Sequence, residues 1–183
     1  VISKNHNNGD AWGARGMIAF SKGNYESADT LLTHAIKYSP NIPDYYINRA
    51  LIRYHNKKLR DAMADYDSAI NVDPQNFLAH YNRGLLRAQV SEDNLAIQDF
   101  DFVLKTEPDN LLALFNRAVL LEKTGGYRQA IKDVSKVIGE YPHFWTGYER
   151  RARCRRKIGD SKGAANDERK VFIAQLDRTF NHK

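Results

Sequence analysis

The chain has 183 residues, and its 28 basic and 22 acidic side chains leave a net charge of +6. This excess is modest, so the location of the basic residues matters more than their number. No apolar run approaches the ~18 residues of a membrane-spanning helix. The single cysteine, Cys154, excludes an internal disulfide framework and leaves the redox compartment open.

The sequence begins at Val1 and shows no secretory signal pattern. We therefore expect a fragment of a longer soluble protein, for which the bacterial cytoplasm, the periplasm and secretion all stay open. Residues 1–8 are polar and lack periodicity, and we expect them to form a lead-in to the folded chain.

A fixed period of 34 residues follows this lead-in. Four of the five prolines keep that spacing: Pro40, Pro74, Pro108 and Pro142. If each unit is aligned so that its proline is position 32, the units begin at Gly9, Pro43, Phe77, Leu111 and Trp145. Self-similarity at a fixed period is typical of a repeat architecture.

Each unit carries the pattern of a helical hairpin. Positions 4, 8 and 11 share one face of a first helix, and positions 20, 24 and 27 share one face of a second. Position 8 is small in every unit, and position 20 is always alanine: Ala28, Ala62, Ala96, Ala130 and Ala164. These small residues allow the two backbones to approach closely, and proline at position 32 ends the second helix. Because one hairpin cannot bury both of its faces, neighbouring units are predicted to stack.

The turns inside the units differ along the chain. The first unit turns at residues 22–25, and the fourth turns at Gly125-Gly126. The third has Asp93 at position 17, where the first, second and fourth units have tyrosine or leucine, so its turn is predicted to pack less well. In the fifth unit Leu176 replaces the proline, which predicts a long last helix over about 162–180 that caps the array or connects it to further chain.

These residues resemble the tetratricopeptide repeat (TPR) family, and the wording of the repeats is similar to that of bacterial members. The resemblance covers residues 9 to about 175. The chain departs from the family pattern in having arginine at position 7 and in its fifth unit. The resemblance implies an all-α, right-handed superhelical solenoid of about five units in a single array, 9–183. It further implies that the first helices line a concave groove that binds a peptide or a protein.

Two charged positions recur inside the units. Position 7 is arginine in all five units, and position 23 is aspartate in the last four: Asp65, Asp99, Asp133 and Asp167. Because a charge at an inner position is costly unless it is paired, we predict Arg–Asp pairs between the first and second helices. Contact with a ligand is the alternative for these arginines.

In the TPR fold, position 6 faces the groove. It is occupied by Ala14 in the first unit and then by Asn48, Asn82, Asn116 and Arg150. A side-chain amide offers both a donor and an acceptor, so it can hold the backbone of an extended peptide. The arrangement looks like the asparagine ladder of O-linked N-acetylglucosamine transferase. The alternative is that asparagine is simply common at this position in the family.

Positions 5 and 9 share the groove and are mainly apolar. They include the candidate ligand contacts Ile47, Tyr81, Phe115, Leu51 and Leu85. Exposed apolar residues in a stripe indicate a binding surface, whereas packing between adjacent first helices is the alternative.

A basic run, residues 149–157, closes the array. Arg150 and Arg153 fall on groove positions, with Lys123 one unit earlier. Such a run favours an acidic segment or a C-terminal carboxylate of a peptide, and phosphate contact is the alternative. A chaperone-binding clamp would need lysine at position 2, which no unit has.

No catalytic, cofactor or metal motif is found. Cys154 lies at position 10 near arginines, where a core role is favoured over a reactive thiolate. We therefore predict a protein-interaction scaffold without cofactors or membrane insertion, rather than an enzyme. A nucleic-acid binder and a non-catalytic module of a larger protein are the alternatives.

Overall fold

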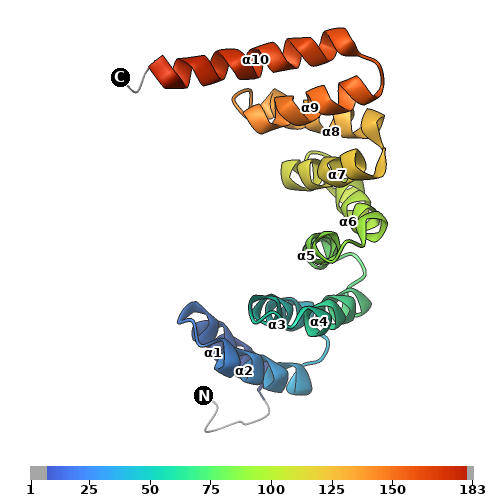
Figure 1. Cartoon of the computed structure of the whole chain (residues 1–183). Helices are drawn as coiled ribbons and strands as arrows, with labels where there is room; N and C mark the ends of the chain where they lie inside the picture. Colours follow the sequence, from blue (N-terminus) through green and yellow to red (C-terminus); the bar gives the residue numbers. More distant parts are fainter. Residues whose placement is uncertain (1–7, 181–183) are drawn as a thin grey trace. The chain divides into compact units, whose positions relative to one another are not determined.

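The computed structural model describes residues 8–180, with the backbone alone for residues 177–180. The described chain consists of α-helices joined by short turns and contains no strand (Figure 1). The helices are α1 (Gly9–Ser21), α2 (Tyr25–Tyr38), α3 (Pro43–His55), α4 (Leu59–Val72), α5 (Phe77–Gln89), α6 (Asp93–Thr106), α7 (Leu111–Thr124), α8 (Tyr127–Glu140), α9 (Trp145–Lys157) and α10 (Ser161–Phe180). Each odd-numbered helix begins at the first residue of a predicted unit. The predicted lead-in falls almost wholly on residues 1–7, outside the described part.

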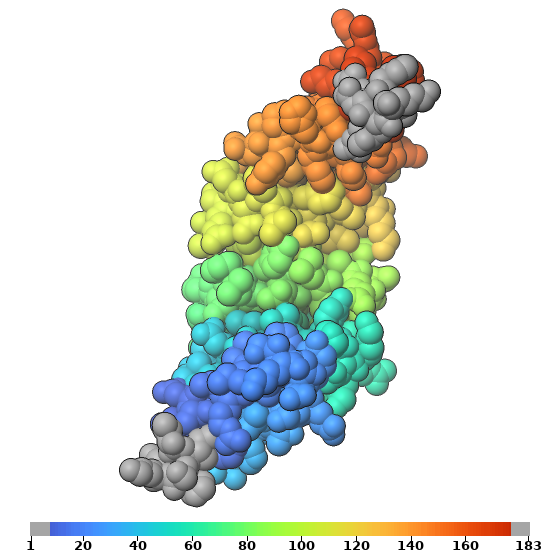
Figure 2. Space-filling view, turned by 90° about the vertical axis from the view of Figure 1, so that its left-hand side faces the viewer, coloured from blue at the N-terminus to red at the C-terminus, as the bar shows by residue number. Residues whose placement is uncertain are grey.

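Two compact parts divide the chain, residues 1–86 and 87–183, and the boundary falls within α5. In the first part, α1 packs on α2 and α3 packs on α4, while α2 also contacts α3. In the second part, α6 contacts α7, α7 packs on α8, α8 on α9 and α9 on α10. Within each part, neighbouring colours touch in the space-filling view (Figure 2). The single array over 9–183 stays a prediction, because each part is described by itself.

Small residues at positions 8 and 20 set the distance between the paired helices. All five alanines at position 20 are buried. A Cβ on Gly16, at position 8 of the first unit, would lie 2.9 Å from Leu32 Cγ. The bulky residues at position 24 fill the space beside them, and Leu32, Tyr66, Phe100 and Val134 are buried. Such interdigitation of large and small side chains is the packing that the hairpin pattern predicts.

Every turn between paired helices uses the same backbone conformation. Position 15 has a positive φ in all five units: Gly23 (77°), Lys57 (63°), Ser91 (64°), Gly125 (91°) and Gly159 (83°). A left-handed residue after a helix satisfies carbonyls at its C-terminal end. The shared conformation therefore places the left-handed residue at the same position in turns of different sequence.

α10 differs from the other second helices in length. It runs on to Phe180, past position 32, where the missing proline predicted a longer helix. Val171 and Ala174 are buried on the side of α10 that packs on α9. None of the described helices is both long enough and apolar enough to cross a membrane.

Candidate functional site

In the first part, the predicted contacts lie on α3 and α5. Leu51, Tyr81 and Asn82 are half-buried, and Leu85 is exposed. The sequence pattern predicts that Ile47 lies in an exposed apolar stripe. In the structure Ile47 is only 5% exposed and belongs to the core cluster of α3, α4 and α5. Its side chain therefore packs between helices, which was the alternative for the apolar stripe.

The amides of Asn48 and Asn82 make no hydrogen bond to another described residue, and both side chains are half-buried. They keep their donors and acceptors for water or a ligand. Asn116, in the second part, is different because it already takes part in an interaction within the protein. The equivalence of the three asparagines in sequence therefore does not extend to their surroundings.

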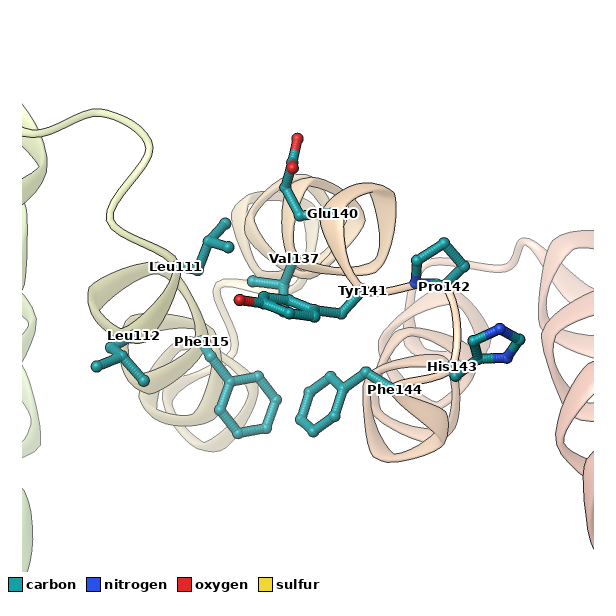
Figure 3. Close-up of a pocket in the computed structure, with 9 residues that line it drawn as sticks. All are labelled: Leu111, Leu112, Phe115, Val137, Glu140, Tyr141, Pro142, His143 and Phe144. Atoms are coloured by element: carbon teal, nitrogen blue, oxygen red, sulfur yellow. The ribbon is translucent and has the colours of Figure 1, made fainter.

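In the second part, an apolar cavity of about 660 Å³ opens beside Phe115. We call it the linker pocket. Figure 3 shows that α7 supplies one wall, the end of α8 the roof, and the α8–α9 linker the opposite wall. Its lining residues are Leu111, Leu112, Phe115, Val137, Glu140, Tyr141, Pro142, His143 and Phe144. Several of these apolar side chains face solvent, with Leu112 66% exposed and Tyr141 61% exposed.

Aromatic contacts hold the base of the linker pocket. The rings of Phe115 and Phe144 meet edge to face, with centroids 4.9 Å apart. The guanidinium of Arg150 lies over Phe115, 5.4 Å from its centroid. An edge-to-face pair and a cation over an aromatic face are both favourable arrangements, so the position of Phe115 is fixed from two sides.

The linker that lines the pocket differs from the two preceding linkers because it lacks a polar cap. In the two preceding linkers, Asn76 and Asn110 cap the next helix, accepting from Ala79 N at 3.1 Å and from Ala113 N at 3.0 Å. An acidic residue accepts from each asparagine amide in turn, Asp73 and Glu107 respectively. The equivalent residues before α9 are Tyr141 and Phe144, and no side chain caps that helix. Sequence reasoning missed the pocket, although the departure of YPHF from the other linkers was a signal that could have found it.

The basic end is already paired. Glu122 accepts from Arg150 and, at 2.6 Å, from Arg153 Nε. Lys123 Nζ lies 2.6 Å from Asp93. Arg151 and Arg155 bind Asp167, and Arg156 binds Glu168, so each arginine of the basic run has an acidic partner. The hydrogen bond from Arg156 holds the pKa of Glu168 below its usual range.

The predicted Arg–Asp pairs are present in the second, fourth and fifth units, and their contacts extend further than expected. Arg117 binds Asp133 through two hydrogen bonds, and Arg49 and Arg151 bind Asp65 and Asp167 in the same way. Each Nη1 of these arginines, and of Arg83, also reaches back to position 25 of the preceding unit. The acceptors there are Thr33, Asp67, Asp101 and Ser135, at 2.7–2.9 Å. The arginines at position 7 therefore have a structural role that joins neighbouring units.

Cys154 is fully buried in the core cluster of α7 to α10. Burial raises the pKa of its thiol to about 11, and the charge of Glu122 acts in the same direction. A protonated, buried thiol is inert, which agrees with a core role. Among the described residues, no group of three or more histidine, cysteine, aspartate or glutamate side chains could hold a metal ion.

Comparisons with known proteins agree with this geometry. Residues 9–42 match the tetratricopeptide repeat family model, and residues 50–91 match a second TPR repeat model. These two segments are tetratricopeptide repeats. No curated protein sequence matches this TPR protein.

Solved structures show the same all-α TPR solenoid fold. The crystal structure of MamA protein is 16% identical with a TM-score of 0.84, and the alignment covers 95% of each chain. MamA from residue 41 to its end, from Desulfovibrio magneticus RS-1, is 17% identical with a TM-score of 0.81, covering 94% of this chain and 96% of that one. YrrB, a TPR protein with an unusual peptide-binding site, is 14% identical with a TM-score of 0.87, covering 97% and 92%. At these identities the likeness concerns the fold of the TPR protein.

Proposed function

We propose that the chain is a non-catalytic protein-interaction scaffold that binds an extended peptide segment of a partner protein. The linker pocket carries this proposal, because it combines a cavity of about 660 Å³ with exposed apolar side chains. Ligand-binding cavities are concave and mostly apolar, with a few polar groups that fix orientation. The linker pocket has this composition, with Glu140 and His143 beside its apolar walls.

Each of the two parts of the chain offers its own contacts to a peptide. An aromatic or branched side chain of the peptide would enter the linker pocket between Leu112 and Tyr141. In the first part, the unoccupied amides of Asn48 and Asn82 would hold backbone groups of a peptide, beside Leu51, Tyr81 and Leu85. Each such hydrogen bond would contribute about 0.5–1.5 kcal/mol.

An acidic residue of the peptide would contact Arg153, which is exposed at the edge of α9. Because Glu122 already pairs with Arg150 and Arg153, the incoming carboxylate would have to compete with it. Lys123 is exposed but is similarly paired with Asp93. We therefore propose that the apolar contacts supply most of the affinity, while the charges affect orientation and association rate.

The comparisons support this proposal at the level of the family. TPR repeats form extended surfaces that typically serve as scaffolds, and YrrB has a peptide-binding site in the same fold. Nucleic-acid binding through the basic run is less favoured, because its arginines are engaged by Glu122, Asp167 and Glu168. A place within a larger protein is compatible with the scaffold role.

A selection from a random peptide library, displayed on phage and panned on the intact chain, tests the proposal. We expect selected peptides to share a bulky apolar residue and to bind Leu112→Ser about tenfold more weakly, as loss of a central apolar contact does. Leu95→Ser is the matched control, because Leu95 is an exposed leucine on the second helix α6. Equal loss in both variants, or binding peptides without an apolar residue in common, would overturn the proposed site.

A further inference from the structure

The last described helix, α10, has an exposed apolar face. It exposes two adjacent large apolar side chains, Phe172 at 60% and Ile173 at 47%. Where nothing packs on a repeat, its outer face is normally polar. The buried residues Val171 and Ala174 face α9, and α9 is the described helix that packs on α10 (Figure 1).

The other units show what normally covers this face. Phe172 is at position 28, which is apolar in every unit and is occupied by Ile36, Ile70, Leu104 and Ile138 in the first four. Ile138 is buried, and its Cγ1 would lie 3.0 Å from a Cβ on Gly147 of α9. Ile70 packs on the core cluster that contains Ala79 of α5. Position 28 therefore packs toward the first helix of the following unit, and in the fourth unit it contacts that helix at position 3.

A polar contact accompanies this apolar one at each junction. Position 25 accepts a hydrogen bond from the position-7 arginine of the following unit at all four junctions, at 2.7–2.9 Å. In α10 this position is Arg169, which is exposed and has no ion pair with another described residue. The α10 surface therefore has the apolar residue that the other junctions have at position 28. At position 25, however, it has a cation where they have a hydrogen-bond acceptor.

We propose that the face of α10 formed by Arg169, Phe172 and Ile173 binds an amphipathic helix of a partner protein, which carries an acidic residue opposite Arg169. The helix packs on α10 as a following first helix packs on α4 or α8. Its apolar stripe covers Phe172, and its carboxylate takes the place that arginine has in the internal junctions. This surface is separate from the linker pocket, so the proposal goes beyond peptide binding there.

Charge argues against a second copy of this chain as the occupant. In a second copy the first helix that could dock here is α1, where Ile18 is 54% exposed at position 10, a position that is buried in the other units. The position-7 residue of α1 is Arg15, so docking of α1 would place Arg15 against Arg169. Like charges across an interface disfavour the pairing. Any further unit with arginine at position 7 would meet the same repulsion.

A synthetic helix provides the probe for the test. Residues 111–124, the sequence of α7, pack on α6 in the protein and contain Ala113, Arg117 and Leu120 at positions 3, 7 and 10. The probe is this peptide with Arg117→Glu, held helical by a hydrocarbon staple on the side away from Ala113 and Leu120, because so short a helix is marginal alone. The unsubstituted stapled peptide is the matched control. Fluorescence anisotropy reports the binding of each peptide to the intact chain.

We expect the Arg117→Glu probe to bind the chain about two- to fivefold more tightly than the control, as for an exposed ion pair. Arg169→Glu in the chain should reverse this order. Phe172→Ser should weaken the probe about tenfold or more while leaving the melting temperature unchanged, because Phe172 is largely exposed. Equal binding of the two peptides, or binding that Phe172→Ser leaves unchanged, overturns the proposal.

Light scattering on the chain without peptide tests the occupant itself. We expect a monomer for the parent chain and for Phe172→Ser. A dimer that Phe172→Ser abolishes would identify a second copy as the occupant and would overturn the proposal. Leu112→Ser, in the linker pocket, should leave the probe affinity unchanged, so that failure here is distinguishable from failure of the proposed peptide site.

Discussion

The aspartates at position 23 are almost inaccessible to water, yet each is surrounded by donors. Asp133 is 1% exposed and accepts from Arg117 Nε, Arg117 Nη2 and Gln129 Nε2 at 2.7–2.8 Å. Removing this carboxylate leaves a guanidinium poorly compensated at a partly buried site. We expect Asp133→Ala to lower the free energy of unfolding by about 3–5 kcal/mol, as for a buried pair that loses one partner.

Asp101→Ala is the control for this prediction. Asp101 accepts from the same arginine at 2.7 Å but is exposed, so its loss should cost about 0–1 kcal/mol. Urea unfolding of both variants, followed by circular dichroism at one pH and salt concentration, measures the difference. Similar costs for the two substitutions would show that burial does not govern the strength of these contacts.

At the scale of the element, the turn between paired helices requires a left-handed residue at position 15. For a residue with a Cβ this conformation costs about 1–2 kcal/mol, which glycine avoids. We therefore expect Lys57→Gly to raise the free energy of unfolding by about 1 kcal/mol, since φ is 63° there. Gly125→Ala should lower it by a similar amount, although nothing lies within 4 Å of the added Cβ.

Gly139→Ala separates this backbone effect from the general preference of helices for alanine. Gly139 lies inside α8, has no neighbour within 4 Å of an added Cβ, and has an ordinary helical φ. Alanine should therefore stabilise the chain there by about 0.5–1 kcal/mol. If thermal unfolding gives the same sign for Gly125→Ala and Gly139→Ala, the left-handed turn is not the cause.

The helices could be predicted closely from the sequence, whereas the site could be predicted only in part. Proline at position 32 and alanine at position 20 constrain the backbone directly, so all five first helices begin where the period placed them. The contacts between units were missed because position 25 contains threonine, aspartate or serine, which share only the ability to accept a hydrogen bond. The burial of Ile47 depends on the neighbouring helices α4 and α5. The periodicity of residues along α3 alone does not show which of its side chains these helices cover.

At the scale of the whole molecule, a net charge of +6 would favour binding to nucleic acid if the basic residues were unpaired. The densest basic run does not meet this condition among the described residues, because each of its five arginines has a carboxylate partner within 4 Å. A phosphate would have to displace Glu122 or Glu168 before it could bind there. We therefore expect no measurable binding of a 30-nucleotide single-stranded DNA at about 150 mM salt, where exposed charges are screened beyond ~8 Å.

Two substitutions test whether this internal pairing is the reason. Glu122→Gln combined with Glu168→Gln removes the carboxylate partners of Arg150, Arg153 and Arg156 without adding positive side chains. The double variant should bind the DNA at about 20 mM salt more tightly than the parent chain, and its affinity should fall steeply as salt rises, since each phosphate contact releases counterions. Fluorescence anisotropy at several salt concentrations gives the salt dependence of the affinity for the parent chain and for the double variant. Tight, salt-dependent binding by the parent chain would mean that the paired arginines still contact phosphates, and the scaffold proposal would then have to include nucleic acid.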